Sequence, residues 1–288
     1  MLVSLYPPLM HILITGCSSG IGLCLAEGLR RRGHRVFASA RNPEDVATLQ
    51  AKGLDAVWLD LADSTSIRAA VDEVLRVGGD LDALINNGGY GQPGAVEDLS
   101  RDALRAQFET NLFGTVELTN LIIPAMRARG AGRIIQISSI LGLAAMPYRG
   151  AYAASKFALE GITDTLRLEL NGSGIRVSLI EPGPIRSRFR PNSLAMFKRY
   201  IDPEHSAHRD RYRGVLHRLE KPGPVNPFTR SSESVLRCVI HALERSRPKI
   251  RYYVTVPTHV VAALRRVLPF GQLDRVLTAA SRAENKEK

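Results

Sequence analysis

Cysteine is scarce in this sequence, with only 3 among 288 residues. Cys17, Cys24 and Cys238 are too few and too widely separated for a disulfide framework. The sequence therefore excludes the class of small secreted domains that are held together by disulfides. We expect a cytoplasmic protein, because free thiols persist in a reducing compartment.

Long hydrophobic runs are also missing. No stretch reaches the roughly 18 consecutive apolar residues that suggest a transmembrane helix, so none is predicted. The opening, MLVSLYPPLMHILITG, is apolar, but it lacks a basic segment and contains two adjacent prolines. It does not fit a signal peptide, and we interpret residues 1–9 as an N-terminal tail.

Acidic residues are outnumbered, with 28 Asp and Glu against 39 Lys and Arg and a formal net charge of +11. Phosphate contacts require Lys and Arg, so a nucleic acid is one candidate partner. No zinc-finger spacing, RNA-binding motif or recognition helix accompanies the charge, so we expect no nucleic-acid partner. We expect no metal site either, because His205 and His208 lack a third ligand at suitable spacing. A basic lid and an anionic cofactor account for part of the charge.

Short β-branched runs alternate with helical patterns along most of the chain. The expected strands are 11–16, 34–41, 55–61, 81–87, 132–139, 175–183 and 250–256. Helical periodicity covers 21–32, 66–76, 100–129 with a kink at Pro124, a stretch from about residue 150, and 232–244. Such alternation predicts an α/β fold: one Rossmann-type, doubly wound parallel sheet of about seven strands with helices on both faces. Ligands bind such sheets at the carboxyl ends of the strands.

No repeat or low-complexity linker divides the chain, so residues 10–288 are predicted to form a single domain. Residues 188–230 interrupt the alternation with five prolines and many basic residues, and we expect them to form a substrate-binding lid. Residues 231–288 supply the C-terminal helices and the last strand. The basic, apolar segment 257–282 fits either a helix packed on the domain, which we favour, or a membrane-surface element.

A glycine-rich turn follows the first expected strand. In TGCSSGIG, Gly16, Gly20 and Gly22 permit a tight turn and a close approach of the backbone to a pyrophosphate. The helix that begins there presents its N-terminus to anions. This context of strand, turn and helix predicts a dinucleotide site, although the spacing differs from the standard Rossmann fingerprint.

Tyr152 and Lys156 lie four residues apart in a helical stretch, so they project from the same helix face. An unperturbed tyrosine has a pKa of about 10, and a neighbouring ammonium lowers that value by stabilising the phenolate. The pair is therefore a candidate proton donor and its electrostatic partner.

The glycine spacing, the NNGG sequence at 86–89, Asn111, Ser139, the Tyr152–Lys156 pair and PGPIRS at 182–187 occur together in this order. From about residue 10 to 190, this combination resembles the short-chain dehydrogenase/reductase family. The resemblance is nearest to the branch of 17β-hydroxysteroid and retinol dehydrogenase-like enzymes. One departure is Gly88, where the family usually has alanine.

The resemblance implies a nicotinamide cofactor. Its expected contacts are Gly16, Ser18, Ser19, Gly20, Ile21, Gly22, Arg41, Asp60, Leu61, Asn87, Gly88, Gly89, Tyr152, Lys156, Pro182, Gly183, Ile185 and Ser187. Asp60 is expected at the adenine edge, Asn87 near the adenosine ribose, and Ile185 and Ser187 at the carboxamide. Ala40 stands where the family has an acid for NAD, and Arg41 follows it, which favours NADP(H) because arginine binds a 2′-phosphate.

The resemblance also implies a catalytic set of Asn111, Ser139, Tyr152 and Lys156. Tyr152 is expected to transfer the proton, Lys156 to lower its pKa and hold the ribose, Ser139 to orient the substrate oxygen, and Asn111 to position a water. The predicted reaction interconverts a carbonyl and an alcohol on an apolar substrate, in a dimer or tetramer. A catalytically silent NADPH sensor is the alternative, and the intact catalytic set argues against it.

Overall fold

Seven parallel strands form the centre of the protein. The computed structural model describes residues 9–224 and 226–284, so most of the predicted tail at 1–9 lies outside the described residues. The strand order is β3-β2-β1-β4-β5-β6-β7, and every neighbouring pair is parallel. The bounds are β1 His11–Ile14, β2 Arg35–Ala40, β3 Asp55–Trp58, β4 Ala83–Asn86, β5 Gly132–Ile137, β6 Ile175–Glu181 and β7 Arg251–Tyr253. The predicted α/β fold with one doubly wound sheet is confirmed.

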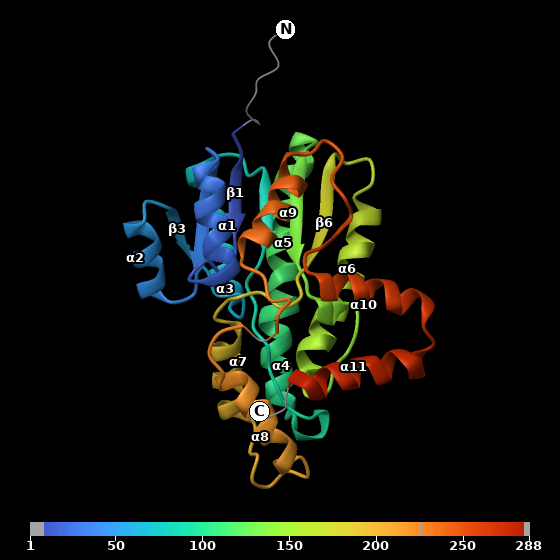
Figure 1. The fold of residues 1–288 in the computed structure, drawn as a ribbon. Coiled ribbons are helices and arrows are strands. Elements are labelled where there is room, and N and C mark those ends of the chain that lie inside the picture. Colours follow the sequence, from blue (N-terminus) through green and yellow to red (C-terminus); the bar gives the residue numbers. More distant parts are fainter. Residues whose placement is uncertain (1–8, 225, 285–288) are drawn as a thin grey trace.

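Helices cover both faces of the sheet (Figure 1). One face is covered by α1 (Gly20–Arg31), α2 (Pro43–Ala51) and α9 (Glu233–Glu244). The other is covered by α3 (Ser64–Gly78), α5 (Gly114–Arg129) and α6 (Gly150–Glu169). The sequence analysis did not identify α2, whose single buried side chain, Leu49, gives it little helical periodicity.

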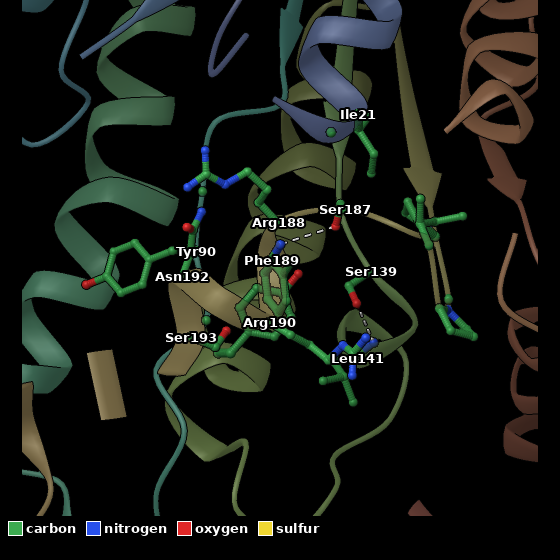
Figure 2. Close-up of a pocket in the computed structure, with 18 of the residues that line it drawn as sticks. Ile21, Tyr90, Ser139, Leu141, Ser187, Arg188, Phe189, Arg190, Asn192 and Ser193 are labelled. Atoms are coloured by element: carbon green, nitrogen blue, oxygen red, sulfur yellow. Dashed lines mark hydrogen bonds between the residues drawn. The ribbon is translucent and has the colours of Figure 1, made fainter. Parts of the chain in front are cut away.

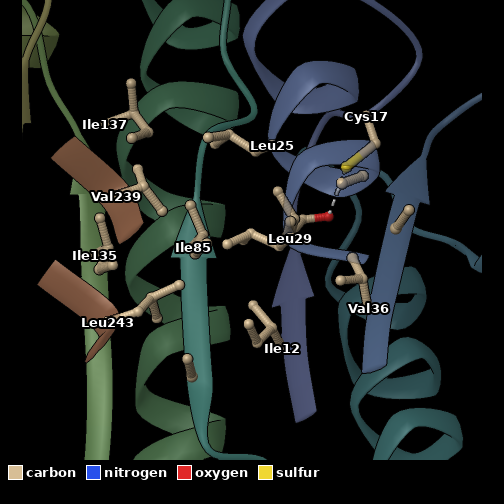
Figure 3. Close-up of a cluster of buried hydrophobic side chains, with 14 of the residues drawn as sticks. Ile12, Cys17, Leu25, Leu29, Val36, Ile85, Ile135, Ile137, Val239 and Leu243 are labelled. Carbon is tan, nitrogen blue, oxygen red and sulfur yellow. Dashed lines mark hydrogen bonds between the residues drawn. The ribbon is translucent and has the colours of Figure 1, made fainter. Parts of the chain in front are cut away.

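The alternation of side chains along each strand produces two separate cores. Ile12 and Ile14 pack with Ile85 on the α1 side, whereas Leu13 packs with Leu84 on the α3 side. Figure 3 shows Ile12, Ile85 and Ile135 on neighbouring strands, facing the side chains of α1 and α9. Strands buried on both faces read as continuous hydrophobic runs, which is why the sequence locates them well.

The helix expected over 100–129 is divided into three parts. Helix α4 (Arg101–Phe108) is followed by a π-helical turn, Glu109–Phe113, and then by α5. Pro124 lies within α5 without ending it. The interruption therefore comes about a dozen residues before the expected kink, at the turn that contains Asn111, and such π turns are frequent at functional sites.

The segment 188–230, expected to be a lid, contains two helices, α7 (Phe189–Tyr200) and α8 (Arg209–Glu220). Figure 1 shows them together at one end of the molecule. They share a small core of their own, built around Phe197, Tyr212 and Val215 and separate from the two cores of the sheet.

Two further helices, α10 (Val256–Val267) and α11 (Phe270–Glu284), complete the described chain and extend from the body of the domain (Figure 1). Leu273 and Leu277 of α11 pack with Val261 of α10 and with Leu143. Val267 and Phe270, at the turn between the helices, are 74% and 85% exposed. This geometry supports the packed-helix interpretation of the segment. No helix in the described part of the chain is long and apolar enough to cross a membrane.

If α11 is a packed element, then Leu277→Ala should lower the free energy of unfolding by about 2–3 kcal/mol, because it leaves a cavity in this cluster. Val267→Ala, at the exposed turn, is the matched control and should change stability by less than about 0.5 kcal/mol. Chemical denaturation of both variants measures the difference. Equal stability of the two variants would contradict the packing.

Candidate functional site

A large pocket lies at the carboxyl ends of the strands. Its volume is about 1860 Å³, well above the roughly 300–1,000 Å³ of a site for one small molecule. The loops that follow β1, β2, β4, β5 and β6 line it, together with α7, α8, α10 and α11. Of all the site residues predicted from the sequence, only Asn111 is absent from the lining. The pocket is therefore larger than one small molecule requires.

In the glycine-rich loop, residues 15–22, the backbone at Gly22 packs closely against the backbone at Gly16. Gly16 and Gly20 have positive φ angles of 71° and 59°, and helix α1 begins at Gly20 with its N-terminus at the pocket. A Cβ atom on Gly22 would lie 2.1 Å from the carbonyl oxygen of Gly16. The loop therefore fits a dinucleotide: it offers a cradle that side chains would fill and a helix N-terminus that attracts phosphate.

Thr15 and Asn87 join this loop to the end of β4. The Thr15 hydroxyl accepts hydrogen bonds from the main-chain amides of Asn87 (2.9 Å) and Gly88 (2.8 Å). The Asn87 side chain donates to the carbonyl oxygens of Thr15 (2.9 Å) and Gly16 (3.1 Å). Asn87 was predicted as a cofactor contact, and in this structure its amide group holds the loop. The sequence analysis missed Thr15, whose one signal is its position directly before the glycines.

The loop after β2 carries the residues that bear on coenzyme choice. Ala40 is buried at the end of the strand, and Arg41 beyond it is exposed at the edge of the pocket. Among the described residues, no carboxylate forms an ion pair with Arg41. On the next loop, Asp60 accepts a hydrogen bond from the Ala62 amide (2.9 Å), which shapes the turn.

Tyr152, Lys156 and Ser139 line the same pocket. Burial raises the pKa of Tyr152 to about 12, although its hydrogen bond with Ser139 acts in the opposite direction. Burial lowers the pKa of Lys156 to about 8, against the opposing effect of Glu160. The Lys156 Nζ donates to the carbonyl oxygen of Ile137 (2.8 Å) and lies 5.8 Å from the centre of the Tyr152 ring.

Lys156 was expected to lower the pKa of Tyr152, and this role stays a prediction. In this structure burial raises the pKa of Tyr152 and the hydrogen bond with Ser139 lowers it, while the Lys156 ammonium donates to the Ile137 carbonyl oxygen. At neutral pH the Tyr152 phenol is therefore protonated.

Asn111 lies behind the pocket wall and is 1% exposed. Its Nδ2 donates to the carbonyl oxygen of Tyr90 (2.9 Å) and to the Ser155 hydroxyl (3.2 Å), while its Oδ1 accepts from the Tyr90 amide (3.1 Å). The side chain thus connects the π-helical turn both to the loop after β4 and to α6.

A group of charged side chains on the far side of Lys156 was not identified from the sequence. Arg251 of β7 forms ion pairs with three carboxylates, those of Glu160, Asp164 and Glu181. Glu160 lies one helical turn beyond Lys156. Burial, followed by the charge of Glu160, raises the pKa of the Glu181 carboxyl. This network ties the middle of α6 to β6 and β7, and no local sequence pattern reports it.

The rest of the pocket wall is largely apolar. Its hydrophobic members include Ile140, Leu141, Ala144, Met146, Phe189, Met196, Val260, Val261, Leu264, Val276 and Leu277. Figure 2 shows Phe189 beside Ser187 and Ser139, with Arg188 and Arg190 on either side of it in the sequence at the start of α7. The Phe189 ring packs edge-on against Tyr152, with ring centres 5.2 Å apart.

Comparison with known proteins identifies the family. Residues 10–196 match the short chain dehydrogenase family. The chain belongs to this family. An uncharacterized oxidoreductase of Escherichia coli, YbbO, is 43% identical over 267 residues, which cover 92% of this chain and 93% of the relative. Human 17-beta-hydroxysteroid dehydrogenase type 1 is 34% identical over 260 residues, with coverage of 85% and 77%. The predicted family resemblance is confirmed.

Solved structures of short-chain dehydrogenases share the fold. One from Burkholderia cenocepacia, in complex with NADP, is 25% identical with a TM-score of 0.73, covering 94% of this chain and 98% of the other. Another from Burkholderia phymatum, in complex with NAD, is 23% identical with a TM-score of 0.74, covering 90% and 92%. These two solved structures share the fold of this short-chain dehydrogenase, and they hold different nicotinamide cofactors.

The glycine loop generates a paired prediction. Gly22→Ala places a methyl group against the Gly16 carbonyl oxygen and should displace the loop, costing about 1–3 kcal/mol of stability and at least tenfold in dinucleotide affinity. Gly161→Ala on α6 is the control: its added Cβ meets no atom within 4 Å, it lies outside the pocket lining, and it should change affinity by less than about threefold. Titration calorimetry measures both variants. Normal binding by the Gly22 variant would refute this role for the loop.

Proposed function

We propose that this short-chain dehydrogenase is an NADP(H)-dependent oxidoreductase that interconverts a ketone or aldehyde with an alcohol on an apolar substrate. The observation that supports this most directly is the position of Tyr152, Lys156 and Ser139 in one pocket with the glycine-rich loop. The bound nicotinamide supplies or accepts hydride. The apolar wall around Tyr152 favours a substrate with a hydrophobic body.

Each side chain has a distinct part in the proposed reaction. Tyr152, whose raised pKa keeps it protonated near neutral pH, donates its phenolic proton to the carbonyl oxygen during reduction. Ser139 orients that oxygen by hydrogen bonding. Lys156, still mostly protonated below its pKa of about 8, stabilises the phenolate that remains. The Asn111 amide is already used by Tyr90 and Ser155, and the positioning of a water by Asn111, which the family resemblance implies, stays a prediction.

The choice of NADP(H) rests on Arg41. Its exposed guanidinium stands at the pocket edge with no acidic partner among the described residues, and buried Ala40 supplies no carboxylate for a ribose hydroxyl. We also propose a cytoplasmic location, which the three free cysteines support. Assembly as a dimer or tetramer and the absence of a nucleic-acid partner stay predictions from the sequence.

Arg41→Ala should weaken NADPH binding by about 1.5–3 kcal/mol, the range for hydrogen bonds to charged groups, because a 2′-phosphate loses its donor. NADH lacks that phosphate and serves as the internal control, with little expected change. Titration of the same protein sample with both cofactors measures the selectivity. Equal losses for NADPH and NADH would refute the assignment.

Tyr152→Phe removes the transferable proton and keeps the ring that packs against Phe189. Because general acid catalysis contributes about 10²–10⁴-fold, kcat for carbonyl reduction should fall by at least that order. The assay follows NADPH oxidation with a panel of steroids, retinoids, long-chain aldehydes and acyl-linked ketones.

Tyr253→Phe is the matched control, since Tyr253 carries the same hydroxyl outside the pocket lining, and its kcat should stay within about twofold of the parent. Thermal melting and NADPH titration establish that both variants fold and bind cofactor. A folded, cofactor-binding Tyr152→Phe protein with near-normal turnover would exclude Tyr152 as the proton donor.

A further inference from the structure

Three arginines come together in the part of the pocket next to α8. Arg149 precedes α6, Arg190 lies on α7 and Arg218 lies on α8, and all three line the pocket. Arg190 donates to the main-chain carbonyl oxygen of Arg218 at 3.1 Å, so the two residues are direct neighbours. An apolar pocket with this much positive charge raises the question of what balances it.

Two of these arginines already have polar partners within the protein. Arg149 forms an ion pair with Glu284. Arg190 donates to the carbonyl oxygens of Arg218, Lys221 (2.7 Å) and Gly223. These carbonyls lie at or just beyond the end of α8, where the helix dipole is negative and favours a cation.

Arg218 is the exception. Its Nε is buried and has no hydrogen-bond partner, and among the described residues no carboxylate forms an ion pair with it. Glu284 is used elsewhere, because one of its oxygens binds Arg149 and the other accepts from Asn226 at 3.5 Å. Burial and then the charge of Arg149 lower the pKa of Arg218 to about 9, against the opposing charge of Glu284. A cation held in such surroundings is unfavourable unless an anion joins it.

We propose that Arg218 binds a carboxylate group carried by the substrate. The Arg218 Nε has no hydrogen-bond partner, and the planar nitrogens of a guanidinium match the two oxygens of a carboxylate. The apolar side chains around Tyr152 hold the rest of the molecule. The inference rests on the proposed function and narrows it: the substrate class is an apolar carbonyl or hydroxyl compound that also ends in a carboxylate.

A binding experiment on the full chain tests the proposal without relying on turnover. Dodecanoate and methyl dodecanoate share an apolar chain and differ in charge, and each is titrated by calorimetry into the protein saturated with NADP. We expect dodecanoate to bind at least about tenfold more tightly than the ester, as a charge-assisted hydrogen bond would give. Arg218→Met, which keeps an apolar stem, should abolish this preference, and Arg218→Lys should retain part of it.

Arg213→Met is the matched control, because Arg213 lies on the same helix with 69% of its side chain exposed and pairs with Asp210. It should retain the parent's preference for the acid. Equal binding of acid and ester by the parent protein would overturn the proposal, and that comparison needs no variant. A preference that survives in Arg218→Met would overturn it as well.

An activity assay distinguishes failure of this inference from failure of the proposed function. The parent enzyme should reduce ω-oxododecanoate with a higher kcat/KM than its methyl ester, and Arg218→Met should remove that difference while still reducing the ester. If the parent reduces both equally, the carboxylate site fails and the oxidoreductase assignment stands. If it reduces no carbonyl compound at all, the proposed function fails, and the dodecanoate titration still decides the role of Arg218.

Discussion

The close contact between the ends of β1 and β4 is the constraint on which the site depends. The Thr15 hydroxyl binds two successive main-chain amides of the neighbouring loop, and Asn87 returns two hydrogen bonds. Two adjacent parallel strands are thereby fixed to each other just where their backbones leave the sheet. Gly16 and Gly22 are required because this contact leaves no room for a side chain. The cradle for a pyrophosphate is a consequence of how two strand ends meet.

Buried charge is the second organising feature, and it is concentrated on α6. Lys156 is 5% exposed, and one turn later Glu160 joins Arg251 and the fully buried Glu181. Isolated buried charges are strongly unfavourable, so the members of this network stabilise one another only in a narrow set of positions. The helix that carries Tyr152 is therefore fixed against β6 and β7 by its ion pairs as well as by its packing.

The sequence predicts the sheet well, because its strands are buried on both faces and appear as hydrophobic runs between glycine turns. It also predicts which residues meet in the pocket, since parallel strands end at the same edge and the family motifs lie in those loops. Interactions between distant segments are a different matter. No local sequence pattern relates Thr15 to Asn87 or Glu160 to Arg251. The pKa of Tyr152 depends on burial of its side chain, which the four-residue spacing to Lys156 does not predict. Whether α7 and α8 form a lid stays a prediction.

The separate core of α7 and α8 has a consequence for local unfolding of this protein. Phe197, Tyr212 and Val215 pack with each other and with the loop around Ala95, and they take no part in the two cores of the sheet. Unfolding of this cluster leaves the hydrophobic contacts of the sheet intact. We therefore expect the free energy of opening α7 and α8 to be smaller than the free energy of unfolding the whole domain. Amide protons of α7 and α8 can then exchange with solvent while those of the central strands stay protected. The end of the pocket lined by α7 and α8 is in this sense a distinct cooperative unit from the end at the glycine-rich loop.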